Sequence, residues 1–450
     1  MNNNNYIIIG KNQISEDQIP TIFPLSVAKY QESFNEVVKS IVKDVFNISV
    51  NNNYYSVYVN LLANKSQKTK YIAMIIELSK SYQIKEIHFD YISPKLSSLF
   101  QGQPRIAELN SANNLIDKKE LKGIFPKYIV NLIFTLLGIF IRKKKGNTES
   151  VIRAWVDVDE KLHEKEFYQS AVLIYPFGLN IKRSFSFIKK VFKTHSNVKL
   201  TGVNYSFLDA LNSIFARDKM ESLVKFEFNG MFRHSKKLLK YKTIYTSDEF
   251  QVGVPILYQN RNNSKIINRA HGMGCYNLEV DYDEFHVFND VQRHYYQRNN
   301  SKIDYKIYPL KKDIIHENSC ESKIVYIDQG DLRRYNFYYE IELQKKVIQS
   351  LEEVAKLTKT EIFVKFHPNR SEAEIKEFNK LYKLKALMSL DYKTNYTFIN
   401  LWSTSYFDFK KHGRFIFVKD DHFNAHYFFG EKINSVHIDD LNTKLLNNDN

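Results

Sequence analysis

Short apolar runs alternate with amphipathic segments over most of this chain, and the alternation is clearest after residue 170. The runs fit buried strands, whereas segments with an apolar residue at every third or fourth position fit helices. Strands that alternate with helices predict a parallel, doubly wound sheet. A first series of strands is expected at 172–175, 198–201, 242–246 and 265–269, with helices at 181–194, 205–215 and 252–259.

A second series of the same kind follows. Its strands are expected at 285–288, 305–308, 323–327, 361–366, 396–400 and 414–418, and its helices at 291–297, 339–357 and 372–382. We therefore predict an α/β protein with two Rossmann-like, doubly wound domains at 1–280 and 310–440, joined by an interdomain segment at 281–309. The first 150 residues are less clear, with one helix expected at 69–82 and one strand at 84–91.

Composition adds a constraint on partners. With 450 residues and 43% hydrophobic side chains, the chain can bury two cores. The 30 tyrosines and 33 phenylalanines are consistent with packed cores and with surfaces that stack on sugars. They can also result only from an AT-rich coding sequence. The net charge of +15 attracts anions such as nucleotide donors, acidic glycans and acidic lipids. This charge is spread along the chain without a nucleic-acid-binding motif, so we expect no nucleic-acid partner.

Cysteine usage and the start of the chain bear on its compartment. Cys275 and Cys320 make neither a disulfide framework nor a metal site, which favours a reducing cytoplasm and predicts no bound metal. The start, Met1-Asn2-Asn3-Asn4-Asn5, lacks the basic-then-apolar pattern of a signal peptide.

One segment points toward a membrane. Residues 128–141 are almost wholly apolar, and Arg142, Lys143, Lys144 and Lys145 follow at once. Spanning a bilayer takes about 20 residues, so this run is too short. It can lie in the cytoplasmic leaflet, with the basic end of 128–145 on anionic lipids, or it can be a buried helix with a solvated basic end.

Ligands of doubly wound sheets bind beyond the carboxyl ends of the strands, so polar residues there are candidates. His271 follows the strand expected at 265–269 and can be a general base, a phosphate contact or part of an ordinary glycine turn. Gly272 and Gly274 in the same loop allow close backbone approach to a ligand.

Acidic residues follow another strand of the first series. Asp248 and Glu249 come after the strand at 242–246 and can activate an acceptor hydroxyl or cap a helix. A second acidic group consists of Asp157, Asp159 and Glu160.

Three clusters follow strands of the second series. Asp328, in Asp328-Gln329-Gly330, can be a base or can hold its loop; Arg333 and Arg334 beyond it can meet phosphates. His367 can donate a proton or a charge-assisted hydrogen bond to a leaving phosphate, with Lys365 adding positive charge and Pro368 ending the strand. Ser403, Thr404 and Ser405 open a predicted helix and can bind a phosphate or form an ordinary cap.

The order of these three clusters resembles bacterial sialyltransferases and polysialyltransferases of the GT-B type, which carry an Asp/Glu-Asp/Glu-Gly motif, a His-Pro motif and a Ser/Thr-rich motif. It is also similar to capsule-building Kdo transferases and, through His271-Gly272, to teichoic-acid glycerophosphotransferases. The resemblance covers roughly residues 240–420. Gln329 departs from the second acidic position, and Lys365 occupies the region where the glycerophosphotransferases carry an arginine.

The resemblance implies a GT-B fold, with two Rossmann-like domains facing a central cleft, and an inverting displacement on a CMP-activated donor without an essential metal. It implies that His367 assists departure of CMP, that Gly330 lets the donor approach the backbone, and that 403–405 bind the donor phosphate. The base would be one of four residues: Asp328, Asp248, Glu249 or His271.

We therefore expect a cytoplasmic, peripherally membrane-associated glycosyltransferase of capsule or lipopolysaccharide synthesis. It would transfer an acidic sugar, a nonulosonic acid or Kdo, to a glycan or lipid-linked glycan acceptor. One alternative is a nucleotide-activated polyol-phosphate transferase of teichoic-acid or capsule synthesis. The other is a non-catalytic protein that binds glycans or nucleic acid.

Overall fold

The structure is a computed structural model with side chains. It describes residues 6–9, 27–66, 69, 86–89, 105–108, 122–143, 148–155, 162–176, 181–216, 219–249, 252, 254–272, 279–308, 322–330, 338–367, 370–391, 394–429 and 433–447.

An eight-stranded sheet forms the first domain, in the order β11-β10-β9-β8-β5-β6-β7-β4. Every pairing in it is parallel except that of the short β4 with β7. Its strands are β4 (Arg142–Lys143), β5 (Ser150–Ala154), β6 (Ala171–Ile174), β7 (Val198–Leu200), β8 (Thr243–Thr246), β9 (Lys265–Arg269), β10 (Glu284–Val287) and β11 (Asp304–Ile307). Its helices are α7 (Ile124–Phe140), α9 (Glu164–Phe167), α10 (Ile181–Thr194), α11 (Phe207–Phe215), α12 (Lys219–Leu238), α13 (Val254–Gln259) and α14 (Asp290–Asn299).

The second domain is built on a six-stranded, wholly parallel sheet in the order β14-β13-β12-β15-β16-β17. Its strands are β12 (Ser322–Ile327), β13 (Ile362–Lys365), β14 (Lys385–Ala386), β15 (Asn395–Asn400), β16 (Gly413–Lys419) and β17 (Ser435–His437). Its helices are α15 (Tyr338–Thr358), α16 (Glu372–Leu381), α17 (Ser405–Phe409), α18 (His426–Phe429) and α19 (Leu441–Leu446), with 3-10 turns at Lys410–His412 and Ile438–Asp440.

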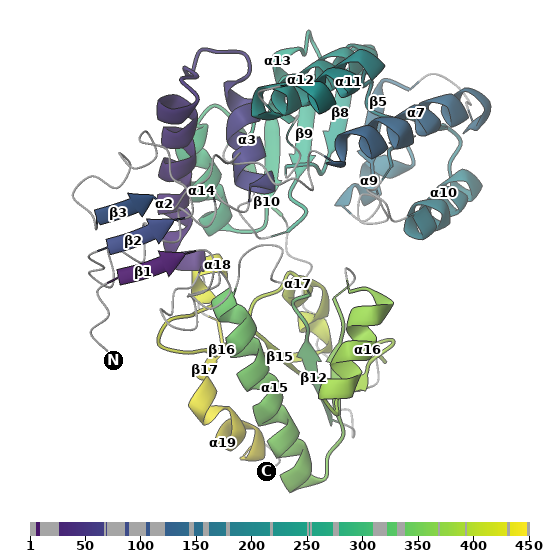
Figure 1. The fold of residues 1–450 in the computed structure, drawn as a ribbon. Helices are drawn as coiled ribbons and strands as arrows, with labels where there is room; N and C mark the ends of the chain where they lie inside the picture. Colours follow the sequence, from purple (N-terminus) through teal and green to yellow (C-terminus); the bar gives the residue numbers. More distant parts are fainter. Residues whose placement is uncertain are drawn as a thin grey trace.

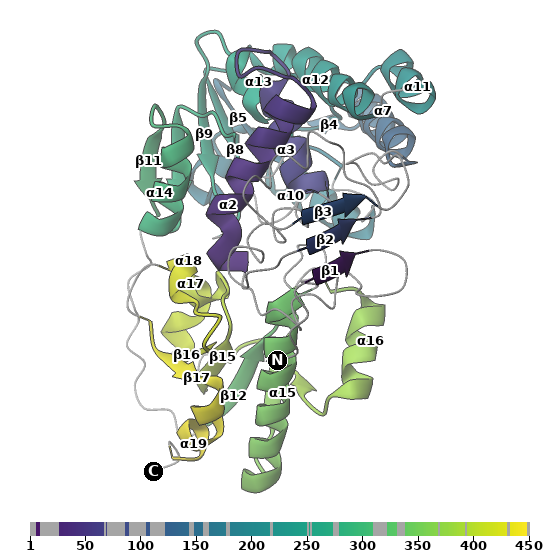
Figure 2. The ribbon, with the colours of Figure 1, turned by 60° about the vertical axis from the view of Figure 1, so that its left-hand side comes forward.

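The described N-terminal part adds a small parallel sheet and a helical pair. The sheet has the order β1-β2-β3, from Tyr6–Ile9, Glu86–Phe89 and Arg105–Glu108. Helix α2 (Val27–Ser40) continues into a π-helical turn at Ile41–Val45, and α3 (Tyr55–Lys65) follows. Apolar side chains of these helices share one core with α12, so the pair packs on the first domain (Figure 2).

Both large sheets have the same strand order. We number the parallel strands of each domain along the chain from its first, which is β5 or β12. The first sheet, read from β7 toward β11, and the second, read from β14 toward β17, then both begin with the order 3-2-1-4-5-6, which is that of a Rossmann sheet. The order reverses between β5 and β8 in the first sheet, and between β12 and β15 in the second. These switch points are where doubly wound sheets bind ligands, because neighbouring loops leave the sheet there in opposite directions.

The two sheets meet along their carboxyl edges. Phe288 directly follows β10 and Phe407 lies in α17, just after β15; their rings stack with centroids 5.4 Å apart. Next to this contact, the Asn289 side-chain amide donates to the carbonyl of Phe428 at 2.8 Å. Figure 1 shows the first domain above the second, with α14 and α18 at their junction. The loops that follow the strands of the two sheets therefore face one another.

Local signals explain why the elements begin where they do. Ser371 caps α16 in a reciprocal capping box with Glu374, which satisfies two N–H groups at the helix start. Ser206 and Asn289 cap α11 and α14 through side-chain oxygens. The strands of the second sheet are filled with buried Val, Ile, Phe and Tyr, as a sheet covered on both faces requires.

The predicted fold is confirmed: the protein is α/β, with two parallel, doubly wound sheets of Rossmann order facing each other as in a GT-B arrangement. Helix α10 and strand β9 have the predicted bounds, and the other predicted elements from 172 to 418 agree within a few residues. The strand expected at 84–91 is β2, whereas the helix expected at 69–82 lies almost wholly outside the described residues. Segment 281–309, expected between the domains, contains β10 and β11, which pair with the first sheet.

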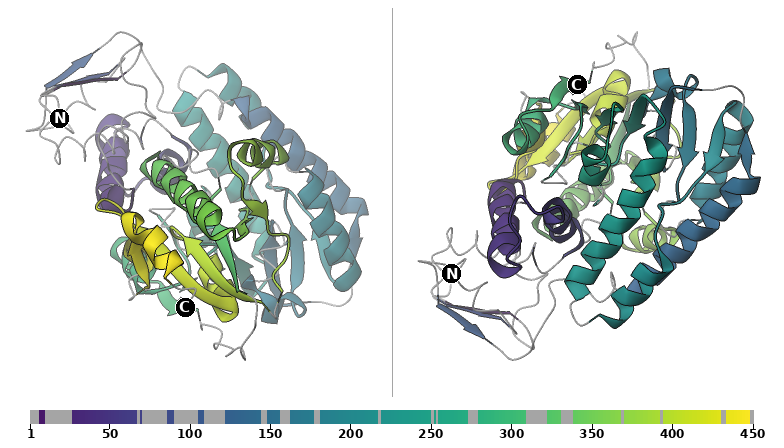
Figure 3. Two further views of the ribbon diagram at one scale, coloured as in Figure 1. Left: turned by 90° about the horizontal axis from the view of Figure 1, so that it is seen from below. Right: turned by 90° about the horizontal axis from the view of Figure 1, so that it is seen from above.

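One prediction about α7 is settled by burial. The alternative of a buried helix is wrong, because only Ile124, Asn131 and Gly138 of α7 are buried and about half of its apolar side chains are exposed. Figure 3 shows the helix along the outside of the first domain. Among the residues that the structure describes, no helix is long and apolar enough to cross a bilayer.

Candidate functional site

Three predicted clusters come together at the carboxyl edge of the second sheet. Asp328 follows β12, His367 follows β13, and Ser403 follows β15, and these strands are neighbours with β12 in the middle. Because the three strands are parallel, their carboxyl ends share one edge. The tertiary structure therefore places the clusters side by side around the switch point between β12 and β15.

Asp328 is an anchor of this edge. Its side chain is buried, and its two oxygens accept from Arg370 in a bidentate pair, at 2.9 Å from Nε and 2.8 Å from Nη2. The same carboxylate accepts from the backbone N–H of His367 at 3.1 Å and from Gln344 at 3.4 Å. Burial by itself lowers the pKa of the Arg370 guanidinium. The pair with Asp328 and the nearby carboxylate of Glu374 outweigh this effect, so the pKa is raised. Asp328 thus holds the start of the His367 turn in place.

Gly330 forms the wall beside the histidine. Its φ is +79°, a conformation that glycine adopts at little cost. A Cβ at this position would lie 3.0 Å from Nδ1 and 3.1 Å from Cγ of His367. The turn that presents the histidine is closed by the backbone N–H of Arg370, which donates to the carbonyl of His367 at 3.0 Å. The imidazole is therefore packed against bare backbone.

Gln329 bridges the switch point itself. Its side-chain amide donates to Asn400 Oδ1 at 2.9 Å and to the carbonyl of Ile327 at 3.0 Å. Asn400 is the last residue of β15 and is fully buried. Gln329, which stands where the resembled motif has a second acidic residue, thus forms a pair of carboxamides with Asn400. This pair connects the ends of β12 and β15.

The hydroxyl cluster begins a helix, as predicted, but the helix α17 is only five residues long. Ser403 Oγ accepts from the backbone N–H of Ser405 at 3.1 Å, and the Ser403 carbonyl accepts from the backbone N–H of Tyr406. Thr404 precedes the helix without a side-chain cap hydrogen bond. All three residues are partly exposed, and they follow β15 at the carboxyl edge of the second sheet.

The switch point of the first sheet carries a buried ion pair. Arg153, near the end of β5, donates to Asp248, just after β8, and both side chains are about 1% exposed. The Arg153 guanidinium also lies over the rings of Tyr175 and Trp155, at 5.2 and 5.9 Å from their centroids. The Tyr175 hydroxyl lies 2.5 Å from His234 Nε2. A cationic and aromatic cluster therefore fills this edge.

Glu249 and His271 are joined through the backbone. The N–H of His271 donates to Glu249 Oε1 at 2.5 Å, and the side-chain amide of Asn268 donates to Oε2 at 3.4 Å. Burial raises the pKa of Glu249 to about 8, against the lowering effect of these hydrogen bonds. Asn268 Oδ1 in turn accepts from the backbone N–H of Asp248 at 3.1 Å. Burial thus favours the protonated form of Glu249.

The other predicted residues have simpler places. Gly272 accepts through its carbonyl from the Gln292 side chain at 2.8 Å, which ties the His271 loop to α14. Lys365 ends β13 and is partly exposed. The remaining predicted residues lie outside the described part of the chain: Pro368, Gly274, Asp157, Asp159, Glu160, Arg333 and Arg334.

The sequence interpretation missed the residues that hold the candidates. Arg370 stands three positions after His367, and that spacing was a usable signal. Arg153 was detectable as a charge within the apolar run Val151-Ile152-Arg153-Ala154-Trp155. Asn268 and Asn400 gave no such signal, because a single amide at the end of a strand is common.

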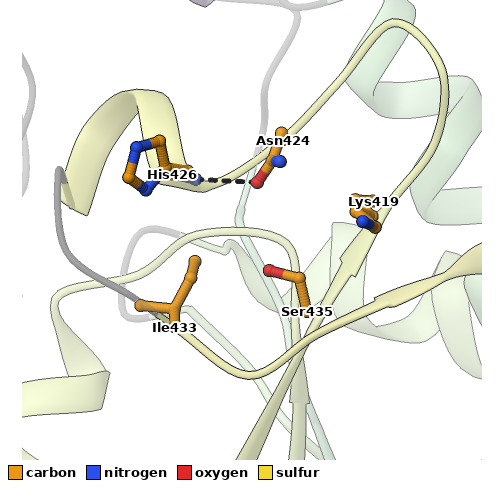
Figure 4. A pocket seen from close by; sticks show the side chains of 5 residues that line it. All are labelled: Lys419, Asn424, His426, Ile433 and Ser435. Carbon is orange, nitrogen blue, oxygen red and sulfur yellow. Dashed lines mark hydrogen bonds between the residues drawn. The ribbon is translucent and has the colours of Figure 1, made fainter.

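Within the described ranges, no group of three or more His, Cys, Asp or Glu side chains is arranged to hold a metal ion. A hollow of about 330 Å³ lies at β16 and β17, lined by Lys419, Asn424, His426, Ile433 and Ser435 (Figure 4). Asn424 Oδ1 accepts from the backbone N–H of His426 at 3.0 Å in its wall. None of these residues belongs to the cluster around His367, so the hollow is separate from the candidate site.

Comparison with known proteins gives a distant structural likeness. The scan against protein-family models and the search of curated proteins found no match. Among solved structures, the chain is similar to a glycosyltransferase from Rickettsia africae ESF-5, with 12% identity and a TM-score of 0.37. The match covers 67% of this chain and 88% of that chain. A likeness at this level supports no conclusion about the chemistry of this chain.

Proposed function

We propose that the protein is an inverting glycosyltransferase that uses a CMP-activated acidic sugar, a nonulosonic acid or Kdo. The observation that supports this most is His367, packed against Gly330 and anchored through Asp328 and Arg370 at the switch point of the second sheet. Rossmann-type sheets bind nucleotides at this point. A histidine fixed there is placed to act on the phosphate of a bound donor.

The second domain supplies the donor side of this proposal. As the bond between the sugar and the phosphate breaks, the leaving CMP takes the electron pair and gains negative charge. His367 donates a proton or a charge-assisted hydrogen bond to it, and Lys365 adds positive charge. Gly330, without a side chain, leaves room for the donor beside the imidazole. Ser403, Thr404 and Ser405 offer hydroxyls to the phosphate.

The first domain supplies the acceptor side. The acceptor hydroxyl attacks the anomeric carbon from the face opposite the phosphate, and a base takes its proton. Asp328 and Asp248 are both buried and paired with arginines, so an acceptor hydroxyl does not reach them. Glu249 is buried and its pKa is raised by that burial. We place the base on His271, whose side chain is partly exposed and whose backbone N–H is held by Glu249.

Charge favours an anionic donor and product. The chain carries a net charge of +15, which attracts nucleotides, acidic sugars and growing acidic glycans. We propose capsule or lipopolysaccharide synthesis in the cytoplasm as the setting, with a glycan or lipid-linked glycan as acceptor. The chemistry proposed needs no metal, because the positive side chains neutralise the leaving phosphate.

A ligand screen tests the donor class directly. Thermal unfolding is followed with CMP, CDP, UDP and GDP, and a ligand present at 100 times its Kd stabilises the fold by about 2.7 kcal/mol. We expect CMP to raise the Tm most, and His367→Ala to keep part of the rise because other groups also contact the nucleotide.

Turnover then separates the reaction classes. We expect CMP release from a CMP-linked nonulosonic acid or CMP-Kdo in the presence of a glycan acceptor. Turnover of a CDP-polyol without turnover of any CMP-sugar would make the protein a polyol-phosphate transferase instead. Indifference to all four nucleotides, together with DNA or RNA binding that weakens steeply with salt, would make it a non-catalytic binder.

A further inference from the structure

Helix α7 carries a stripe of large apolar side chains on its outer face, in addition to those that pack against the domain. Its exposed face carries Leu132, Ile133, Leu136, Ile139 and Phe140, spaced three or four residues apart, and Phe140 is 82% exposed. A helix that packs on a domain normally turns such residues inward. The apolar stripe of α7 is therefore turned away from the domain that holds the helix.

The inner face of α7 fits the domain closely, with a buried asparagine and a buried glycine beside Phe134 and Leu137, which pack against a core. Asn131 Oδ1 accepts from the backbone N–H of Val203 at 2.8 Å, and the Asn131 amide donates to the carbonyl of Lys127 at 2.8 Å. A Cβ on Gly138 would lie 1.9 Å from the carbonyl oxygen of Leu200, so only glycine fits there. These contacts fix the rotation of the helix, and the exposed apolar stripe is a consequence of that fixed rotation.

Helix α11 extends the apolar surface. Phe207 lies beside Phe125 and Tyr128 of α7, with ring centroids 6.5 and 5.9 Å apart. Leu208 and Phe215 of α11 are 68% and 80% exposed. Helices α7 and α11 lie side by side in the first domain (Figure 1), and both carry exposed large apolar side chains. Exposed patches of this kind mark membrane or protein contacts.

Cations gather at the C-terminal end of the same helix. Arg142 and Lys143 are exposed in β4, and β4 pairs with β7, where Arg142 lies opposite Lys199. Partial burial and the positive charges of Lys240, Lys237 and Arg142 lower the pKa of Lys199. The aliphatic stem of Lys199 lies near Gly138 of α7. The apolar stripe thus ends in a positively charged cluster.

We propose that α7 and α11 form a docking surface for an anionic phospholipid bilayer. The exposed side chains of the stripe enter the boundary between headgroups and acyl chains, while Arg142, Lys143, Lys199, Lys237 and Lys240 contact the acidic headgroups. Apolar insertion beside a basic cluster is the chemistry by which interfacial helices bind such membranes. The positively charged cluster beside the stripe favours an anionic lipid surface over an apolar protein surface as the partner. This inference goes beyond the proposed transfer reaction and does not depend on it.

Vesicle sedimentation of the full chain tests the proposal. We expect the protein to sediment with vesicles of equal parts phosphatidylcholine and phosphatidylglycerol, and to stay in solution with phosphatidylcholine alone. Ile133→Glu with Leu136→Glu places two charges in the stripe and should lower the partition coefficient at least about tenfold. Arg142→Glu with Lys143→Glu should lower it by a similar factor, because each cation near such a surface contributes about fivefold.

Matched controls separate position from composition. Leu357→Glu changes a leucine that is 70% exposed at the end of α15 in the second domain, and Lys376→Glu changes an exposed lysine of α16. Both should leave vesicle binding unchanged. Because every altered side chain is exposed, all variants should unfold at nearly the wild-type temperature, which a thermal scan checks.

Three results would overturn the proposal. The first is equal sedimentation with neutral and with acidic vesicles, or no sedimentation with either kind. The second is unchanged binding by both double variants. The third is a wild-type dimer in sedimentation velocity that Ile133→Glu with Leu136→Glu converts to monomer, without acidic-vesicle binding by either form. That last result would assign the surface to a second copy of the chain.

Discussion

Gly330 and the His367 imidazole lie so close that a Cβ on the glycine would approach Nδ1 to 3.0 Å. The two residues follow neighbouring parallel strands, β12 and β13, and are 37 positions apart in the chain. The glycine also adopts a φ of +79°, where a side chain is disfavoured. Backbone conformation and ring position are thus coupled at the edge where we place the donor.

Gly330→Ala should displace the histidine and strain the loop. The left-handed backbone costs a non-glycine residue about 1–2 kcal/mol, and the new methyl group must push the imidazole aside. We expect a lower Tm and a loss of transfer rate of about tenfold or more, since small misplacements of a catalytic group are costly. Unfolding scans and CMP-release rates measure the two effects.

The double variant Gly330→Ala with His367→Ala identifies the cause. Without the imidazole the methyl group has room, so part of the stability lost in Gly330→Ala should return. Strictly additive losses would show that the two residues do not interact, because coupling between contacting residues appears as non-additivity.

The pair between Asp328 and Arg370 should be needed mainly for structure. Asp328→Ala leaves a buried, uncompensated guanidinium, and breaking a buried pair costs about 3–5 kcal/mol. We expect denaturant unfolding to show this loss, and Arg370→Met combined with Asp328→Ala to restore some stability by removing both charges.

Kinetics distinguishes this role from that of a base. If Asp328 only positions His367, Asp328→Asn should lower kcat while the pH at which the rate rises stays the same. Disappearance of that pH-dependent rise in Asp328→Asn would assign the proton transfer to Asp328 after all.

His367→Ala should lower the transfer rate strongly. Loss of a general acid typically lowers the rate by a factor of about 100 or more. His367 is partly exposed, so the fold should persist, as a thermal scan would verify. The exposed His294 of α14 provides the comparison, since His294→Ala should leave the rate intact. Near-wild-type turnover in His367→Ala would exclude the role.

Glu249 should make stability depend on pH. Burial raises its folded-state pKa from 4.5 to about 8, so the folded protein keeps a proton that the unfolded chain loses. The contribution is fully present below about pH 4.5 and is lost as the pH rises toward about 8, with a slope of up to about 1.4 kcal/mol per pH unit. Glu249→Gln should flatten this part of the stability curve. Parallel curves for wild type and variant, measured by denaturant unfolding, would contradict the raised pKa.

Chelation should leave the transfer rate unchanged. The proposed mechanism neutralises the leaving phosphate with His367, Lys365 and hydroxyl groups, so it needs no cation. CMP release is measured after treatment with EDTA and again after Mg²⁺ or Mn²⁺ is added. A rate that falls with EDTA and recovers with either ion would contradict the metal-free reaction.

The sequence determined the elements and the strand ends that carry polar residues. The apolar run that ends at Lys365 forms the strand Ile362–Lys365, because a strand buried on both faces is apolar at successive positions. The spacing of apolar residues in 181–194 predicted the observed bounds of α10. The short-range rule that ligands bind after strands also singled out Asp328, His367 and Ser403. These features depend on neighbours in the chain, which a sequence displays.

The tertiary structure decided which of these residues meet and what each one contacts. Only the strand order brings Arg153 to Asp248 and Gln329 to Asn400 across the two switch points, and neither partner can be read from spacing. The orientation of α7 was likewise open, because an apolar run has the same pattern whether it faces inward or outward. Asn131 and Gly138 settle it, since the hydrogen bond to Val203 and the close backbone approach at Leu200 turn their side of the helix toward the domain and leave the apolar stripe on the other side exposed.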